Sequence, residues 1–130
     1  MILTLIQHAT QDQVSRWVQP ALDQKVIWCQ LFSEPDAGSD AAGVKTKATR
    51  VDGGWLVNGQ KVWTSGAHKS THGLATVRTD STMGKHGGVS AFVIDMRAKG
   101  SSKTCSALLH RPRRKAAARS STASPMCRRR

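Results

Sequence analysis

The chain has 130 residues, 38% of them hydrophobic, and its 20 lysines and arginines against 8 acids give a formal net charge of +12. This length accommodates about one domain and excludes a large multidomain enzyme within the chain, while the hydrophobic content is ordinary for a globular protein. Residues 100–130 hold 9 lysines and arginines and no acid, so a nearly neutral body precedes a purely basic segment.

The first part of the chain has the pattern of helices. Residues 1–8 are apolar enough for a helical end, and Thr10 with Gln13 has the spacing of a capping box. From Val14, apolar residues recur at i, i+3 and i+4, which marks one face of a helix. Pro20 is expected to end this short helix.

From residue 28 onward the hydrophobic period changes to two, which is typical of strands. Strands are expected at residues 44–49, 55–57, 60–63, 74–77 and 89–94. Asp52-Gly53-Gly54 and Asn58-Gly59 each have the composition of a hairpin turn, and a polar, glycine-rich loop separates the last two strands. The pattern therefore predicts a mainly β fold: an antiparallel, β-barrel-like middle domain preceded by a short helical segment.

The densest cluster of polar and glycine residues runs from Leu31 to Gly43. Its proline and glycines indicate a tight, irregular loop whose small polar residues could present hydroxyls or amides to a ligand. A plain surface turn capped by Asp40 is the alternative. Glu34 is a candidate general base, although a single carboxylate beside proline is more often an ion-pair partner in a loop.

Two aromatic residues and two histidines also leave alternatives open. Trp55 and Trp63 flank the Asn-Gly turn, where they could pack in the core or form an aromatic wall against a planar cofactor. His68 and His72 have the i, i+4 spacing of metal ligands on a helix, but the intervening residues disfavour a helix, so no metal site is expected. The three cysteines lack Cys-x-x-Cys spacing, which favours neither a disulfide framework nor zinc and makes a reducing compartment the default.

Three segments together closely resemble the acyl-CoA dehydrogenase family of flavoproteins: Trp28–Asp40 (WCQLFSEPDAGSD), Lys45–Lys47 (KTK) and Trp55–Ser65 (WLVNGQKVWTS). The resemblance covers about residues 1–99. It implies that residues 1–27 are a remnant of an N-terminal helical domain and that residues 28–99 are an incomplete middle β domain. Residues 100–130 are then a basic, low-complexity tail, which its polar composition predicts to be disordered.

The resemblance also implies FAD as cofactor and an acyl-CoA thioester of fatty-acid metabolism as substrate. By resemblance, the cofactor-binding residues are Gln30, Leu31, Phe32, Ser33, Gly38, Ser39, Trp63, Thr64 and Ser65. Ser39 also contacts the acyl-CoA chain in this scheme, the segment from Trp63 to Ser65 covers the isoalloxazine ring, and the Ser65 hydroxyl lies near the reactive flavin nitrogen.

The family's catalytic carboxylate belongs to a C-terminal helical part, so no residue of this chain is assigned a catalytic role. We expect a truncated acyl-CoA dehydrogenase-like chain that is inactive alone. The change of composition at Gly100 is what out-of-frame translation of a GC-rich gene would give. The resemblance also implies a possible homo-oligomer, as in members of the family.

The alternative is a small basic protein that binds nucleic acid through Arg111–Lys115 and Arg128–Arg130. Such binding would be non-specific, because no aromatic residue follows Phe92 to stack on bases. A structural or interaction protein without a ligand also stays open. The start lacks a basic n-region and no stretch approaches the ~20 apolar residues of a membrane span, so we expect no membrane association and a cytoplasmic location.

Overall fold

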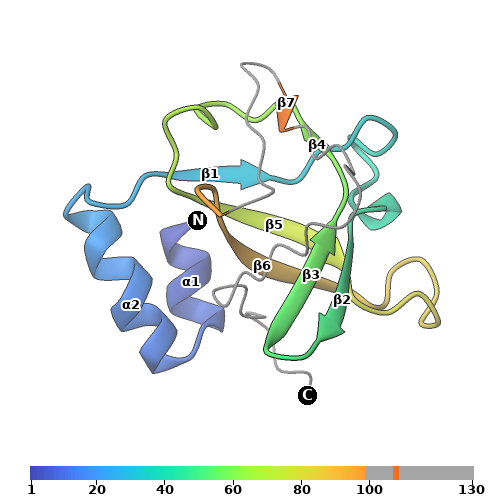
Figure 1. Cartoon of the computed structure of the whole chain (residues 1–130), viewed down its shortest axis with the longest axis horizontal. Helices are drawn as coiled ribbons and strands as arrows, with labels where there is room; N and C mark the ends of the chain where they lie inside the picture. Colours follow the sequence, from blue (N-terminus) through green and yellow to red (C-terminus); the bar gives the residue numbers. More distant parts are fainter. Residues whose placement is uncertain (99–106, 109–130) are drawn as a thin grey trace.

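The computed structural model describes residues 1–98 and the short strand at residues 107–108. Two helices, α1 (Ile2–His8) and α2 (Gln11–Leu22), precede a sheet (Figure 1). The remaining elements are, in chain order, β1 (Trp28–Leu31), the 3-10 turn η1 (Ala41–Gly43), β2 (Lys47–Val51), β3 (Gly54–Asn58), β4 (Lys61–Val62), β5 (His72–Arg78), β6 (Val89–Asp95) and β7 (Ala107–Leu108). The chain is thus mainly sheet with short helices.

The capping box at the start of α2 is confirmed. The Thr10 hydroxyl accepts from the Gln13 amide at 3.3 Å, and the Gln13 side chain accepts from the Thr10 amide at 3.0 Å. The prediction that Pro20 ends the helix is wrong, because α2 continues to Leu22. Proline lacks the amide that would bond one turn back, but a single lost bond in the last turn does not stop the helix.

Strand β5 lies at the centre of the sheet. It pairs antiparallel with β6 along its whole length, from His72 opposite Asp95 to Arg78 opposite Val89. On its other side it runs parallel to β1 over four residues and meets β2 in parallel at one further pair. The predicted antiparallel, barrel-like domain is therefore not confirmed: over the described residues the sheet is mixed and open.

The two turn signals have different outcomes. Asp52-Gly53 joins β2 and β3 as an antiparallel hairpin, as predicted. The hairpin predicted at Asn58-Gly59 is wrong, because β4 pairs with β7 instead of β3. A Cβ on Gly59 would lie 2.6 Å from the Thr46 Cα, so this glycine serves a close crossing of two chain segments.

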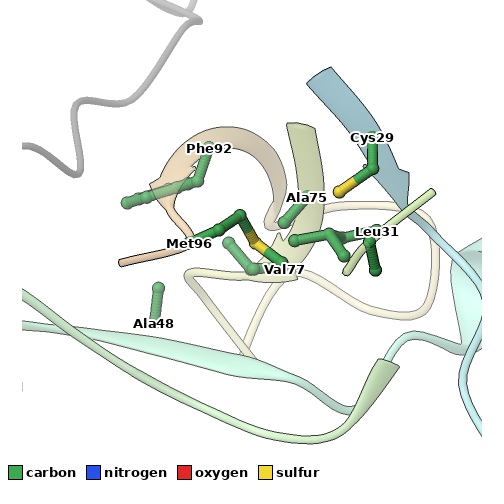
Figure 2. Close-up of a cluster of buried hydrophobic side chains, with 8 residues drawn as sticks. Cys29, Leu31, Ala48, Ala75, Val77, Phe92 and Met96 are labelled. Carbon is green, nitrogen blue, oxygen red and sulfur yellow. The ribbon is translucent and has the colours of Figure 1, made fainter. Parts of the chain in front are cut away.

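Both faces of the sheet are buried. Leu74 and Val93 pack on one face against Leu5, Trp17 and Val18 of the helices. The opposite face holds a second cluster, shown in Figure 2, which consists of Cys29, Leu31, Ala48, Ala67, Ala75, Val77, Phe92 and Met96. Alternate residues of β5 and β6 thus point to opposite cores, which fixes the register of both strands.

The predicted disordered tail lies outside the described residues apart from β7, which pairs with β4 through Lys61 opposite Leu108 and Val62 opposite Ala107. The basic clusters at residues 111–115 and 128–130 are likewise outside the described part of the chain.

Candidate functional site

Two segments far apart in the sequence form a pocket of about 370 Å³. One wall comes from β1 and the two residues after it, and the other from β4 and the residues that follow it. The lining residues are Met1, Trp28, Cys29, Gln30, Phe32, Ser33, Val62, Trp63 and Ser65. The walls are joined directly, because the Val62 amide donates to the Ser33 carbonyl at 2.9 Å.

Five of the nine residues proposed for cofactor binding line this pocket: Gln30, Phe32, Ser33, Trp63 and Ser65. Leu31 belongs to the core and is only 1% exposed, because side chains alternate along β1. Thr64 bonds back to the Val62 carbonyl at 3.4 Å and does not line the pocket. Gly38 and Ser39 are exposed on the adjoining loop, outside the pocket wall.

Trp63 is the most unusual side chain of the pocket. It is 81% exposed, and its backbone has a φ of 56°, in the left-handed region that non-glycine residues rarely adopt. This conformation costs about 1–2 kcal/mol, and strain of this kind is concentrated at ligand sites. The two tryptophans therefore separate: Trp55 packs edge-on against Phe92 in the core, whereas Trp63 presents its ring to the pocket and the solvent.

A buried ion pair lies behind the pocket. The Lys61 ammonium is 2.7 Å from Glu34 Oε1, and both side chains are at most 4% exposed. Burial would raise the pKa of Glu34, but the hydrogen bonds from Lys61 and from the Lys45 and Thr46 amides outweigh it and hold this pKa below its usual value. Burial lowers the pKa of Lys61, and Glu34 opposes that shift. Of the two sequence interpretations of Glu34, the ion-pair partner is therefore the one that the structure favours.

Arg78 organises the loops beside the pocket segments. Its guanidinium donates to backbone carbonyls of two loops, namely those of Ala42 and Val44 in one and of Gly84, Lys85 and Gly87 in the other. An ion pair of 2.8 Å between Lys85 and Asp40 joins the same two loops. The loop that carries Gly38 and Ser39 is thus anchored to the turn between β5 and β6.

Sequence reasoning missed the roles of Lys61 and Arg78. Lysine in a short predicted strand is ordinarily a solvated residue, and arginine at the end of a strand is too. The sequence carried no signal for either, since Glu34 lies 27 residues from Lys61 and the Ala42 carbonyl lies 36 residues from Arg78, and the nearer acceptors of Arg78 are backbone carbonyls, which any residue provides.

No metal centre is found among the described residues: no three histidine, cysteine, aspartate or glutamate side chains group there. His68 is exposed in a turn and His72 lies in β5, so the two do not share a helix face. Over the same part of the chain, no helix has both the length and the apolar character needed to cross a membrane.

Comparison with known proteins gives a consistent set of relatives. Residues 29–126 match the family model of the acyl-CoA dehydrogenase middle domain, a range that extends past residue 99. Acyl-CoA dehydrogenase FadE34 of Mycobacterium tuberculosis is 50% identical over 97 residues, which are 75% of this chain and 14% of that protein.

Solved structures give the same result. The steroid ACAD Tcur3481-Tcur3483 is 26% identical, with a TM-score of 0.78 over 95% of this chain and 32% of that one. The FAD complex of PigA is also 26% identical, with a TM-score of 0.71 over 78% of this chain and 26% of its own. The chain thus spans between about a seventh and a third of the length of these relatives.

Proposed function

This chain belongs to the acyl-CoA dehydrogenase family through its middle domain, and from that premise we propose that it binds FAD in the pocket between residues 30–33 and 62–65. The observation that carries the proposal is the convergence of two distant segments, both resembling flavin-binding motifs of the family, on one pocket. The FAD complex of PigA, with a similar fold, supports FAD as the ligand.

The side chains present fit a flavin ring. The exposed Trp63 indole offers a flat apolar surface for stacking, and Ser33 and Ser65 bring hydroxyl groups to the same pocket. Trp28 lines the pocket too, and its buried indole Nε1 has no hydrogen-bond partner in the described part of the chain, which leaves a donor for a ligand carbonyl. When bound, FAD supplies an acceptor for a hydride equivalent.

The residues of the chain then divide the work. Trp63 covers the ring and excludes water from one side of it, while Ser33 and Ser65 orient it through their hydroxyls. Ser39, on the exposed loop, contacts the acyl-CoA. The reaction to which this site contributes is the α,β-dehydrogenation of an acyl-CoA thioester. The site works in an oligomer, as in the two-protein steroid ACAD Tcur3481-Tcur3483. The cytoplasmic location stays a prediction.

We assign no catalytic base to this chain. Within residues 1–98, no carboxylate lines the pocket, and the nearby buried acid Glu34 is held by Lys61 and two amides. Loss of a general base typically removes ~10²–10⁴ in rate, and the lost positioning adds to that. The 130-residue chain alone is therefore expected to bind FAD but not to oxidise acyl-CoA.

The binding test is a titration of the full chain with FAD, followed by flavin and tryptophan fluorescence. Saturable binding that weakens in Trp63→Ala, but not in Leu22→Ala, supports the proposal. Leu22 is a suitable control because it is also exposed and lies on α2, away from the pocket. A chain that leaves both fluorescence signals unchanged would refute it.

The activity test adds octanoyl-CoA under anaerobic conditions to the FAD-saturated chain and follows the absorbance of oxidised flavin. No bleaching is expected. Bleaching that disappears in the Trp63→Ala, Ser65→Ala double variant would show that the chain is active alone and that a base has been overlooked.

A further inference from the structure

We propose that the buried pair Lys61 and Glu34 positions the two walls of the pocket for flavin binding, an inference that rests on the proposed FAD site. Neither side chain lines the pocket. Both are attached to the segments that do, and they are placed where those segments meet.

Lys61 is fully engaged by three acceptors. Its ammonium donates to the Phe32 carbonyl at 3.2 Å, to Glu34 Oε1 at 2.7 Å and to the Thr76 carbonyl at 2.7 Å. An ammonium has three protons, so all three are used and the orientation of the side chain is fixed. The lysine thereby connects β4 to the end of β1 and to the central strand β5.

The residue next to Lys61 repeats the connection through the backbone. The Val62 amide donates to the Ser33 carbonyl at 2.9 Å, directly beside the Phe32 carbonyl that Lys61 holds. Phe32 and Ser33 form part of one wall of the pocket, and Val62 and Trp63 part of the other. Two adjacent residues of β4 thus hold two adjacent carbonyls of the opposite wall.

Glu34 extends the same framework to the exposed loop. Its side chain accepts from the Lys45 amide at 2.7 Å and the Thr46 amide at 3.0 Å, which fixes the entry to β2. Its backbone pairs in both directions with Ala37, closing the turn that leads into Gly38. Glu34 therefore contributes at both places, through its backbone where the loop leaves β1 and through its carboxylate where β2 begins.

The arrangement suits positioning better than general stability. Breaking a buried pair by removing one partner is strongly destabilising, whereas replacing both partners by neutral residues of similar volume is often neutral. The directional bonds to Phe32 and Thr76 disappear in every variant that replaces Lys61. A variant that lacks both charges should therefore remain folded while the two walls lose their fixed separation, and sites with a loose support bind poorly.

The experiment compares FAD binding by the full chain with that of Lys61→Met and of the double variant Lys61→Met, Glu34→Gln. The matched control is Lys25→Met, the same substitution at a lysine outside this framework, whose ion pair with Asp23 is exposed, with side chains 74% and 37% accessible. Circular dichroism establishes which variants are folded. Flavin fluorescence gives the Kd, and the absorbance spectrum of bound flavin reports the surroundings of its ring.

The double variant is expected to fold, to bind FAD about tenfold more weakly and to give an altered bound-flavin spectrum, while Lys25→Met matches the parent in all three. A folded double variant with the parent's Kd and spectrum would overturn the inference. A double variant that does not fold would overturn it too, by assigning the pair to stability. If the parent chain itself does not bind FAD, the proposed function is what fails.

Discussion

The crossing of Gly59 over Thr46 gives the sharpest test of the fold, because sequence and structure assign this glycine different roles. In an Asn-Gly hairpin turn, both central residues need a positive φ, so alanine would be unfavourable at either position. In the structure, Asn58 is the last residue of β3 and is not among the described non-glycine residues with positive φ. Gly59 has a φ of 159° and lies against Thr46, so glycine is required there by the backbone conformation and by the lack of space.

The magnitude follows from the contacts of an added methyl group. A Cβ on Gly59 would lie 2.6 Å from the Thr46 Cα and equally close to its Cβ, and within contact of its hydroxyl oxygen. Separations under 3 Å to a backbone atom force the chain to move. Overpacking typically costs about 1–3 kcal/mol, and we expect the upper end of that range for Gly59→Ala. For about 100 folded residues, this lowers the Tm by roughly 12–24 °C.

The assay is thermal and urea unfolding followed by circular dichroism. Gly38→Ala is the matched control, because an added Cβ there has no heavy atom within 4 Å. Asn58→Ala distinguishes the two roles and should change stability by less than about 0.5 kcal/mol. Comparable losses in Asn58→Ala and Gly59→Ala would show that the Asn-Gly hairpin forms after all and that the crossing is wrong.

The remaining predictions concern pH and backbone strain. Burial lowers the pKa of His72, although Asp95 opposes this shift. The contribution of His72 to the free energy of unfolding is therefore full above about pH 6.5 and is lost as the pH falls through its folded-state pKa. His72→Gln should reduce the dependence of the urea midpoint on pH between about pH 7 and 5. The pKa of Glu34 is lowered from 4.5, so its contribution to the free energy of unfolding is lost only below that pH. Glu34→Gln should make stability less dependent on pH below 4.5. An unchanged pH dependence in this range would contradict the role of Glu34 as a buried ion-pair partner. Trp63→Gly should relieve the left-handed strain, raise stability by roughly 0.5–1 kcal/mol and weaken FAD binding, whereas a lowered Tm would refute the strain argument.

The elements that the sequence predicted correctly depend on neighbours close in the chain. The capping box of Thr10 acts over three residues, and the hairpin at Asp52-Gly53 joins adjacent strands. The alternation of Val44, Thr46 and Ala48 correctly marks a buried face, but the strand predicted at 44–49 is displaced, since β2 spans Lys47–Val51. Strands β5 and β6 also pair in sequence order, across the expected polar loop.

The parallel pairing of β1 could not be predicted in the same way. Trp28 lies opposite His72, 44 residues later, and no turn residue specifies such a pairing. It depends on two cores: Cys29 and Leu31 join one face of the sheet, while Trp28 packs with Trp17 on the other. The position of β1 beside β5 follows from the burial of both faces of the sheet, which the strand propensities of single residues do not predict.

The candidate site shows the same division between short-range and long-range information. The family motif assigned Ser33, Trp63 and Ser65 to one ligand, and the structure brings these three residues to the wall of the same pocket. The motif did not indicate that Lys61, inside the same motif, is buried, because a lysine is buried only when acceptors for its three protons converge from elsewhere in the fold. Those acceptors are Phe32 and Glu34 in the segment that follows β1, and Thr76 in β5. The sequence motif therefore identifies Trp63 as a residue of the site, whereas the burial of Lys61 depends on the fold and is not predicted by the motif.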